Sequence, residues 1–238
     1  MSYTLVLNSS NVSANAKNTY VYNFIGGNFT VKEGSEICVS NITIPYSWYN
    51  ISSTYNNKQF QFTWRVGTNT TTYTITLPDG FYLISDINQY LETYCQLNGF
   101  YLINDVGNYV YYIQLLENTN YYKIQLLTYA VPTSLPPNWS QPANFAGYPS
   151  VATAPSFIVL NNNFTNLIGF TAGTYGGGSA DSSVMSSNTP QGSVVNSVVV
   201  RCSLVSNNCG FPSDILDSIS INAQIGSNMN YDPPFRNG

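Results

Sequence analysis

Apolar and polar side chains alternate in many short stretches of the chain, and this alternation indicates β-strands. In residues 60–65 (FQFTWR), Phe60, Phe62 and Trp64 would share one face of a strand. Residues 71–77 (TTYTITL) place aromatic or aliphatic side chains between threonines in the same way. A strand with one apolar face must bury that face against another layer. The pattern therefore predicts an all-β fold built from stacked sheets.

Further strands are expected wherever this alternation or a short β-rich run recurs between polar turns. The expected strands are Glu36–Ile44, Phe60–Arg65, Thr71–Leu77, Tyr109–Leu116, Tyr121–Tyr129, Phe157–Leu160, Asn166–Phe170, Val194–Leu204 and Ile219–Ile221. Residues 117–120 (ENTN) would connect two of them as a hairpin. This number and spacing of strands is typical of a β-sandwich or jelly roll. We expect one domain over residues 1–238, with extended N-terminal and C-terminal segments.

One amphipathic helix is expected at about residues 85–97. Ile84, Ile87, Leu91 and Tyr94 recur three or four residues apart, which would place them on one helical face. Ser85 or Asp86 is a suitable N-terminal cap, and Asn98-Gly99 a suitable stop. A shorter helical turn is expected at residues 212–216, capped by Ser213 or Asp214. The turn at Pro78-Asp79-Gly80 precedes the long helix, and Pro45 should end the strand that begins at Glu36.

Two long loops interrupt this pattern. Within residues 132–155, five prolines after Pro132 exclude a strand: Pro136, Pro137, Pro142, Pro149 and Pro155. Residues 173–192 (GTYGGGSADSSVMSSNTPQG) are small and polar. Loops of this length within a compact domain are usually functional or disordered. Contact with neighbouring subunits and simple solvation are both open for these two loops.

Charged residues make up only 8% of the 238 residues, and 31 Asn and 20 Tyr take much of their place. Ordinary monomers need a charged surface to stay dispersed, so this composition favours a protein packed in an assembly. The seven basic residues are scattered, which argues against direct binding of nucleic acid. No apolar run approaches the ~18 residues of a membrane span. Residues 1–5 (MSYTL) do not have the pattern of a secretory signal, and none is expected.

The chain contains no histidine, which excludes Ser-His-Asp and Cys-His catalysis. The cysteines Cys38, Cys95, Cys202 and Cys209 include no C-x-x-C pair, so reduced and mostly buried thiols are expected rather than a zinc site. Asp214 and Asp217 could act as an acid and a base only if a fold placed them in a cleft. We therefore expect no enzyme, and no catalytic, cofactor-binding or metal-binding residue.

Two further features have a functional and a structural interpretation. The glycines of residues 173–178 (GTYGGG) resemble a phosphate loop, but no lysine follows them, and a plain loop is the better prediction. Aromatic side chains such as Trp48, Tyr49, Trp139 and Tyr148 could stack on sugars, as in a glycan-binding attachment protein. Packing in a core or an interface is the commoner use of aromatic residues in so aromatic a chain.

Four motifs occur in order between about residues 36 and 232. They are ICVSNITIPYSWYNI at residues 37–51 followed by Tyr55-Asn56-Asn57, TITLPDGFYLISDINQYLE at 74–92, LNNNFTNLIGF at 160–170, and VVVRCSLVSNN with PSDILDSISI at 198–208 and 212–221. Together they resemble the penton or minor-capsid proteins of virophages, polinton-like viruses and related large double-stranded DNA viruses.

The resemblance implies a single jelly roll in the virion capsid, assembled in the infected host cell. It implies a homopentamer that fills the fivefold vertex among double-jelly-roll major capsid proteins, and no catalytic residues. A minor capsid protein that cements the shell elsewhere is the close alternative. The segment Tyr231-Asp232-Pro233-Pro234-Phe235 is expected to be an extended tail.

Overall fold

The computed structural model describes residues 4–14, 16–24, 26, 30–193, 195–206 and 212–233 of the protein. Sequence features at Val194, at Cys209 and at the tail residues Pro234 and Phe235 lie outside the described residues. The chain divides into two compact units. We call Met1–Ser40 with Arg201–Asp217 the terminal unit, and Asn41–Val200 with Ser218–Gly238 the central unit. The expectation of a single domain over residues 1–238 stays a prediction.

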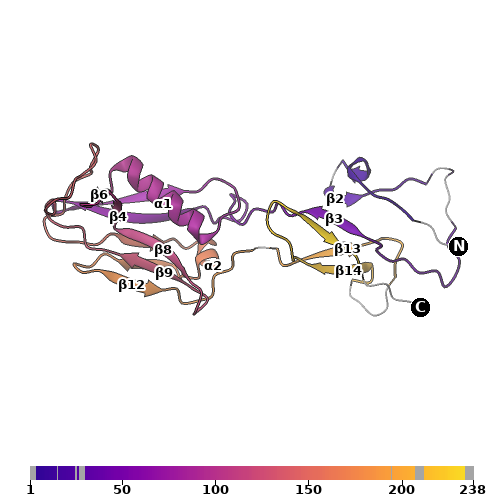
Figure 1. Ribbon diagram of the computed structural model, residues 1–238. Helices are drawn as coiled ribbons and strands as arrows, with labels where there is room; N and C mark the ends of the chain where they lie inside the picture. Colours follow the sequence, from indigo (N-terminus) through magenta and orange to yellow (C-terminus); the bar gives the residue numbers. More distant parts are fainter. Residues whose placement is uncertain are drawn as a thin grey trace. The chain divides into compact units, whose positions relative to one another are not determined.

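The central unit is mostly β (Figure 1). One sheet has the strand order β11-β10-β4-β5, and another has the order β12-β9-β8. Their strands are β4 (Gln59–Val66), β5 (Asn69–Thr76), β8 (Ile113–Asn118), β9 (Lys123–Thr128), β10 (Ser156–Val159), β11 (Gly173–Gly176) and β12 (Ser182–Met185). Two smaller antiparallel pairs are β6 (Tyr101–Ile103) with β7 (Tyr109–Tyr111), and β3 (Ile42–Pro45) with β15 (Asn228–Tyr231).

In β4, the alternation of apolar and polar residues in the sequence corresponds to an alternation of buried and half-buried side chains. Phe60, Phe62 and Trp64 are at most 2% exposed, and the residues between them are only half-buried. Their rings meet other aromatic side chains: Phe60 stacks on Phe164 with ring centroids 5.1 Å apart, and Phe62 meets Phe100 edge-on at 5.5 Å. Burying one such side chain stabilises the fold by about 1.5–3 kcal/mol. This core extends from Ile51 to Phe170 along the chain and draws on both sheets and the long helix.

The long helix α1 (Ile84–Asn98) confirms the helix expected at about residues 85–97. Ile87, Leu91 and Cys95 form its buried face. Asp86 accepts a hydrogen bond from the backbone N–H of Leu83 at 2.8 Å, so it caps the helix from the first turn rather than from the cap position. The helix ends at Gly99, whose φ of 71° lies in the left-handed region.

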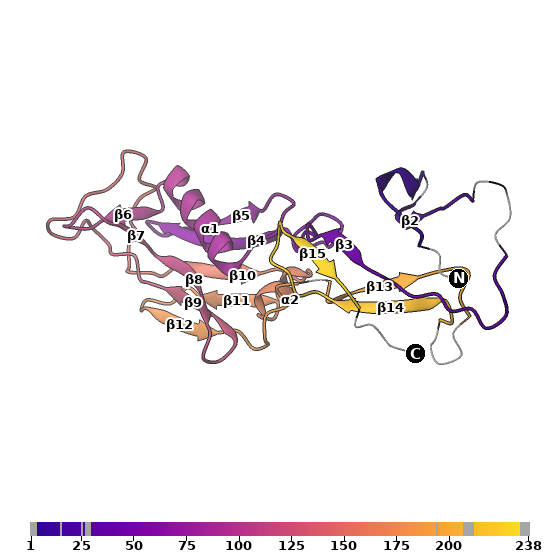
Figure 2. The same cartoon turned by 45° about the vertical axis from the view of Figure 1, so that its right-hand side comes forward.

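Helix α1 also connects the free edges of the two main sheets, as Figure 2 lets the reader follow. The side chain of Asn88 accepts a hydrogen bond from the backbone N–H of Leu115 in β8 at 2.8 Å. The hydroxyl of Tyr90 donates to the backbone oxygen of Thr76 at the end of β5, at 3.3 Å. An unpaired strand edge invites pairing with other chains. The helix therefore closes the core on the side where β5 and β8 would otherwise lie open.

Several expected elements have different bounds. The predicted strand over Asn166–Phe170 is wrong, because helix α2 (Phe164–Ile168) occupies most of it. The loop predicted at residues 173–192 is wrong in part, because it contains β11 and β12. The strand expected at Glu36–Ile44 shortens to β3, which ends at Pro45 as predicted. Residues 212–216 form no helix, because β14 (Ile215–Ser220) begins within them.

The remaining elements are short. The 3-10 helix η1 (Ser9–Asn11) precedes β1 (Val12–Ser13), which pairs with β2 (Ala16–Tyr20). Strand β13 (Ser197–Arg201) lies within the expected strand over Val194–Leu204 and pairs with β14. The protein is thus mostly β, with α1 and α2 as the α-helices of the described part. None of the described helices is long and apolar enough to cross a membrane.

Candidate functional site

The corner that follows β3 carries the first of the four sequence motifs, and its centre is the buried side chain of Asn50. The Asn50 carboxamide oxygen accepts from the backbone N–H of Tyr82 at 2.8 Å. Its nitrogen donates to the backbone oxygens of Tyr82 at 2.8 Å and of Gly192 at 2.9 Å. One side chain that is 1% exposed therefore joins three segments that are far apart in the sequence.

The rest of the corner is equally satisfied. Asn57 accepts from the backbone N–H of Ser52 at 2.9 Å and donates to the backbone oxygen of Asn50 at 2.6 Å. Ile51 and Gly80 exchange two backbone hydrogen bonds. Buried polar groups that are fully paired stabilise a unique structure and leave nothing for a ligand to bind. The polar side chains of this motif therefore stabilise the corner.

The turn at Pro78-Asp79-Gly80 holds the outer side of this corner. The Asp79 carboxylate lies 2.5 Å from the Lys58 ammonium and accepts two longer hydrogen bonds from Ser53. The hydrogen bond from Lys58 is the main reason that the pKa of Asp79 lies below its usual value. Because the carboxylate is already engaged by two residues of the corner, its role here is to hold a loop.

The described cysteines are free thiols in three different environments. Cys95 is buried, and burial raises its pKa to about 12, which keeps it protonated and unreactive at neutral pH. Cys202 is half-buried and Cys38 is exposed, so the expectation of mostly buried thiols is wrong for Cys38. Cys209 lies outside the described residues. Within the described chain, no three His, Cys, Asp or Glu side chains come together as a metal site would require.

The two carboxylates considered for acid–base chemistry lie around the start of β14. Asp214 is held by Arg201, whose Nε lies 3.0 and 3.1 Å from the two carboxylate oxygens. A second guanidinium nitrogen of Arg201 lies 2.9 Å from Oδ2. Asp217 is half-buried on β14 itself. Sequence reasoning missed this ion pair, because Arg201 and Asp214 meet only through the pairing of β13 with β14.

The glycine-rich segment at residues 173–178 contributes a strand to a sheet. Residues 173–176 pair with β10 as β11, and the chain continues into another strand, β12, where a phosphate loop would need a helix. Gly176 has a φ of 79°, and a Cβ there would lie 2.8 Å from the backbone oxygen of Pro155. The glycine is therefore required by close packing of backbone against backbone.

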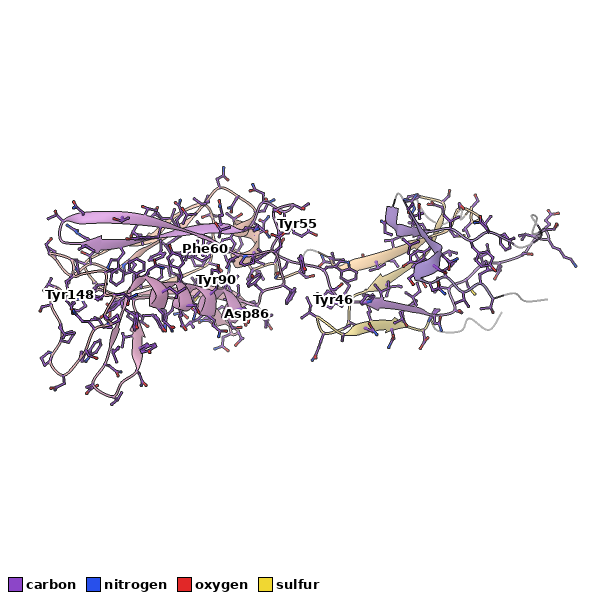
Figure 3. All side chains as sticks on the ribbon, turned by 90° about the horizontal axis from the view of Figure 1, so that it is seen from above. Tyr46, Tyr55, Phe60, Asp86, Tyr90 and Tyr148 are labelled. Carbon is purple, nitrogen blue, oxygen red and sulfur yellow. The ribbon has the colours of Figure 1, made fainter. Side chains whose placement is uncertain are left out.

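The aromatic side chains proposed for sugar stacking are used in packing. Trp139 and Tyr148 are half-buried and contact the hydrophobic core. The ring of Tyr148 lies 4.5 Å from that of Phe145, and its hydroxyl donates to Gln141 at 2.9 Å. Figure 3 shows Tyr148 and Tyr55 at opposite ends of the body that contains Phe60. Trp48 packs against Tyr46 with centroids 5.2 Å apart, and Tyr49 stays 53% exposed.

One shallow hollow of about 410 Å³ lies between α1 and β8. It is lined by Ser85, Asn88, Gln89, Glu92, Leu115, Leu116 and Glu117. The carboxylate of Glu92 accepts a hydrogen bond from Asn88 at 2.8 Å, so one of the two acids is already engaged. Among the described residues, no hydrogen bond joins Ser85 to Glu92 or Glu117, and no cluster of metal ligands lies in this hollow.

What stands out is a surface, and it belongs to the terminal unit. No side chain that the structure describes in this unit is buried. Its large apolar residues are nevertheless 39–69% exposed: Leu5, Val6, Leu7, Tyr20, Val21, Tyr22, Val31, Ile37 and Leu204. Isolated apolar side chains on a surface are normal, but these nine belong to one small unit in which no described side chain is buried.

No protein-family model, curated protein or solved structure matches the chain.

Proposed function

We propose that this chain is a structural protein of a viral capsid, and that it forms the pentameric penton capsomer at the vertices. Its neighbours there would be double-jelly-roll major capsid proteins, and its place would be the virion capsid of a double-stranded DNA virus. The four ordered sequence motifs support this proposal through their resemblance to penton and minor-capsid proteins. The penton protein acts by shape and contact, and carries out no reaction.

The observation that carries the proposal is the absence of buried side chains in the described part of the terminal unit. Folding must offset about 1–2 kcal/mol of backbone entropy for each ordered residue, and burial of apolar surface is the main term that does so. A unit that orders many residues and whose described side chains are all at least partly exposed draws its stability from other contacts. Those contacts are supplied by neighbouring proteins in an assembly.

The composition supports the same interpretation. With 8% charged residues, the surface consists mainly of uncharged polar and aromatic groups. Such a surface repels its neighbours weakly and forms hydrogen bonds readily, which suits permanent contacts between subunits.

The fold suits this role as well. Two antiparallel sheets of the central unit share one core, which is the general plan of a sandwich. We infer that the complete protein has the single jelly roll expected of this family.

The proposal is tested by measuring the amount of the chain in purified virus particles by quantitative mass spectrometry. We expect five copies at each vertex, counted against the major capsid protein. A protein that is found only in the soluble fraction of infected cells, and never in particles, would contradict a capsid role. A ratio that matches sites between capsomers rather than vertices would replace the penton by a cementing minor capsid protein.

A further inference from the structure

The terminal unit combines exposed apolar side chains from two distant parts of the sequence. Val6 in the N-terminal part is 69% exposed, and Leu204 in the C-terminal part is 60% exposed. Val21 and Val31 are 50% and 47% exposed. Moving such side chains out of water lowers the free energy by about 25 cal/mol per Å² of apolar surface buried. The unit as a whole therefore gains from being covered by a partner.

The charges of this unit restrict what the partner can be. Its full sequence carries Lys17, Lys32 and Arg201 against Glu33, Glu36, Asp214 and Asp217. Arg201 is engaged with Asp214 inside the unit. The remaining charges are few and of both signs, so they offer neither a basic patch for nucleic acid or anionic lipid nor an acidic patch for a basic protein.

A second copy of the same unit satisfies this charge pattern. Lys32 lies beside Glu33 and Glu36 in a single exposed turn and its continuation, and no ion pair joins these three within the described residues. Neighbouring copies of the unit can therefore offer each other both a cation and an anion. Contacts between copies of a unit with sparse, balanced charge avoid the repulsion that a surface of one charge sign would bring.

The strands of the unit offer edges for the same contact. Strands β1 and β2 form a sheet of only two strands. A two-stranded sheet is marginally stable in water and gains from additional strands or from packing against a partner. The outer edge of a two-stranded sheet is where a strand of a neighbouring chain can be added.

We propose that the terminal unit is the self-association surface of this protein, where each copy covers the exposed apolar side chains of another. This inference rests on the proposed capsid function and deepens it, because it assigns the subunit contact to one unit of the chain. The central unit, which has its own core, does not hold the copies together.

Single substitutions to aspartate test this assignment in the full-length protein. Val6→Asp and Leu204→Asp change residues of the terminal unit that are 69% and 60% exposed. The matched controls Val106→Asp and Val151→Asp change residues of the central unit that are 73% and 58% exposed. Because all four side chains are largely in water in the single chain, aspartate should leave its folding intact, which circular dichroism verifies.

The readout is the mass in solution by light scattering over a range of concentrations. We expect a wild-type mass of five times 26.2 kDa, and the same mass for both control variants. The two variants of the terminal unit should dissociate, with dissociation constants raised at least about tenfold. If all variants keep the wild-type mass, or if only Val106→Asp and Val151→Asp dissociate, the inference is wrong although the capsid function stands. A wild-type chain that remains monomeric at every concentration also overturns the inference, whereas the count in purified particles judges the capsid function independently.

Discussion

At the scale of single residues, buried polar side chains such as Asn50 stabilise the fold. Asn50 makes three hydrogen bonds that need one acceptor and two donors on one planar group, a set that only the carboxamide side chains offer. The sequence motif that contains it identified the corner. It gave no sign that Tyr82 and Gly192 would be the partners, because these contacts span 32 and 142 residues.

Replacement of this side chain tests its role. Asn50→Ala leaves the backbone groups of Tyr82 and Gly192 without their partner in a buried site, so we expect a loss of about 2–4 kcal/mol in the free energy of unfolding. Urea denaturation followed by tryptophan fluorescence measures this loss. Asn120→Ala is the control, because Asn120 is exposed at the tip of the β8–β9 hairpin, and it should change stability by less than about 0.5 kcal/mol. We call Asn50, together with Asn57 that bonds to its backbone, the Asn50 clamp. Equal effects of the two substitutions would show that this clamp does not stabilise the fold.

The buried thiol of Cys95 makes stability depend on pH. Burial raises its pKa from 9.0 to about 12, so the folded state holds this proton more tightly than the unfolded state does. The contribution is fully present below pH 9 and is lost as the pH rises from 9 towards 12. We expect Cys95→Ala to be less stable than wild type at pH 7, because it leaves a cavity. Its stability should nevertheless fall less steeply above pH 9, by up to about 1.4 kcal/mol per pH unit. Urea denaturation at pH 8, 9, 10 and 11 measures the two slopes, and parallel slopes would show that folding does not raise the pKa of Cys95.

At the scale of elements, helix α1 depends on its C-terminal glycine. Gly99 has a φ of 71°, and a Cβ there would lie 2.0 Å from the backbone oxygen of Asn144. Gly107 has a φ of 84°, but a Cβ there meets nothing within 4 Å. Both alanine variants incur the strain of a left-handed backbone, about 1–2 kcal/mol. Only Gly99→Ala also forces two backbones apart, so it should lose at least about 2 kcal/mol more than Gly107→Ala in urea denaturation. A similar loss for both would mean that the loop at Asn144 moves away freely.

The elements that the sequence predicted well are those whose pattern is local. Helix α1 and the strands β4, β5 and β9 have apolar residues at helical or alternating spacing, and their bounds agree with the prediction to within about two residues. The strand predicted at Tyr109–Leu116 divides into β7 and β8. Helix α2 was mistaken for a strand because residues 166–170 contain a short apolar run that fits either structure. Contacts with distant residues favour the helix: the side chain of Asn163, which precedes α2, donates to the backbone oxygen of Tyr55 at 2.8 Å.

The strands β11 and β12 could not be found from the sequence for a related reason. Most of their residues are small or polar, and their sequences show no alternation of apolar and polar residues. They become strands because β10 and β9 present edges to them, in the registers Phe157 to Tyr175 and Leu126 to Val184. Tertiary context overrides local propensity in such segments. The same holds for the surface proposed for self-association, since exposure of an apolar residue cannot be read from its neighbours in the sequence.

At the scale of the whole molecule, one continuous segment builds the hydrophobic core, and the two ends of that segment lie close together. All residues of the main core lie between Ile51 and Phe170. The two ends of residues 50–192 meet where the Asn50 side chain donates to the backbone oxygen of Gly192 at 2.9 Å. A segment that has its own core and adjoining ends satisfies the usual conditions for a domain inserted into another. The sequence suggested a single domain over residues 1–238, and a fragment of the chain can distinguish the two descriptions.

A fragment of residues 47–193 should fold without the rest of the chain. It retains the core and the Asn50 clamp, so we expect a cooperative urea transition and dispersed amide signals in a proton–nitrogen NMR spectrum. A fragment of residues 58–193 keeps most of the core but lacks Ile51 and both clamp residues, Asn50 and Asn57. It should be less stable by several kcal/mol, since it loses a fully buried side chain and leaves buried backbone groups unpaired. If the longer fragment is unfolded while the full chain is folded, residues outside 47–193 complete the core, and a single domain over the whole chain is the correct description. If it folds, the capsid contacts proposed for the terminal unit can be altered without disturbing the central core.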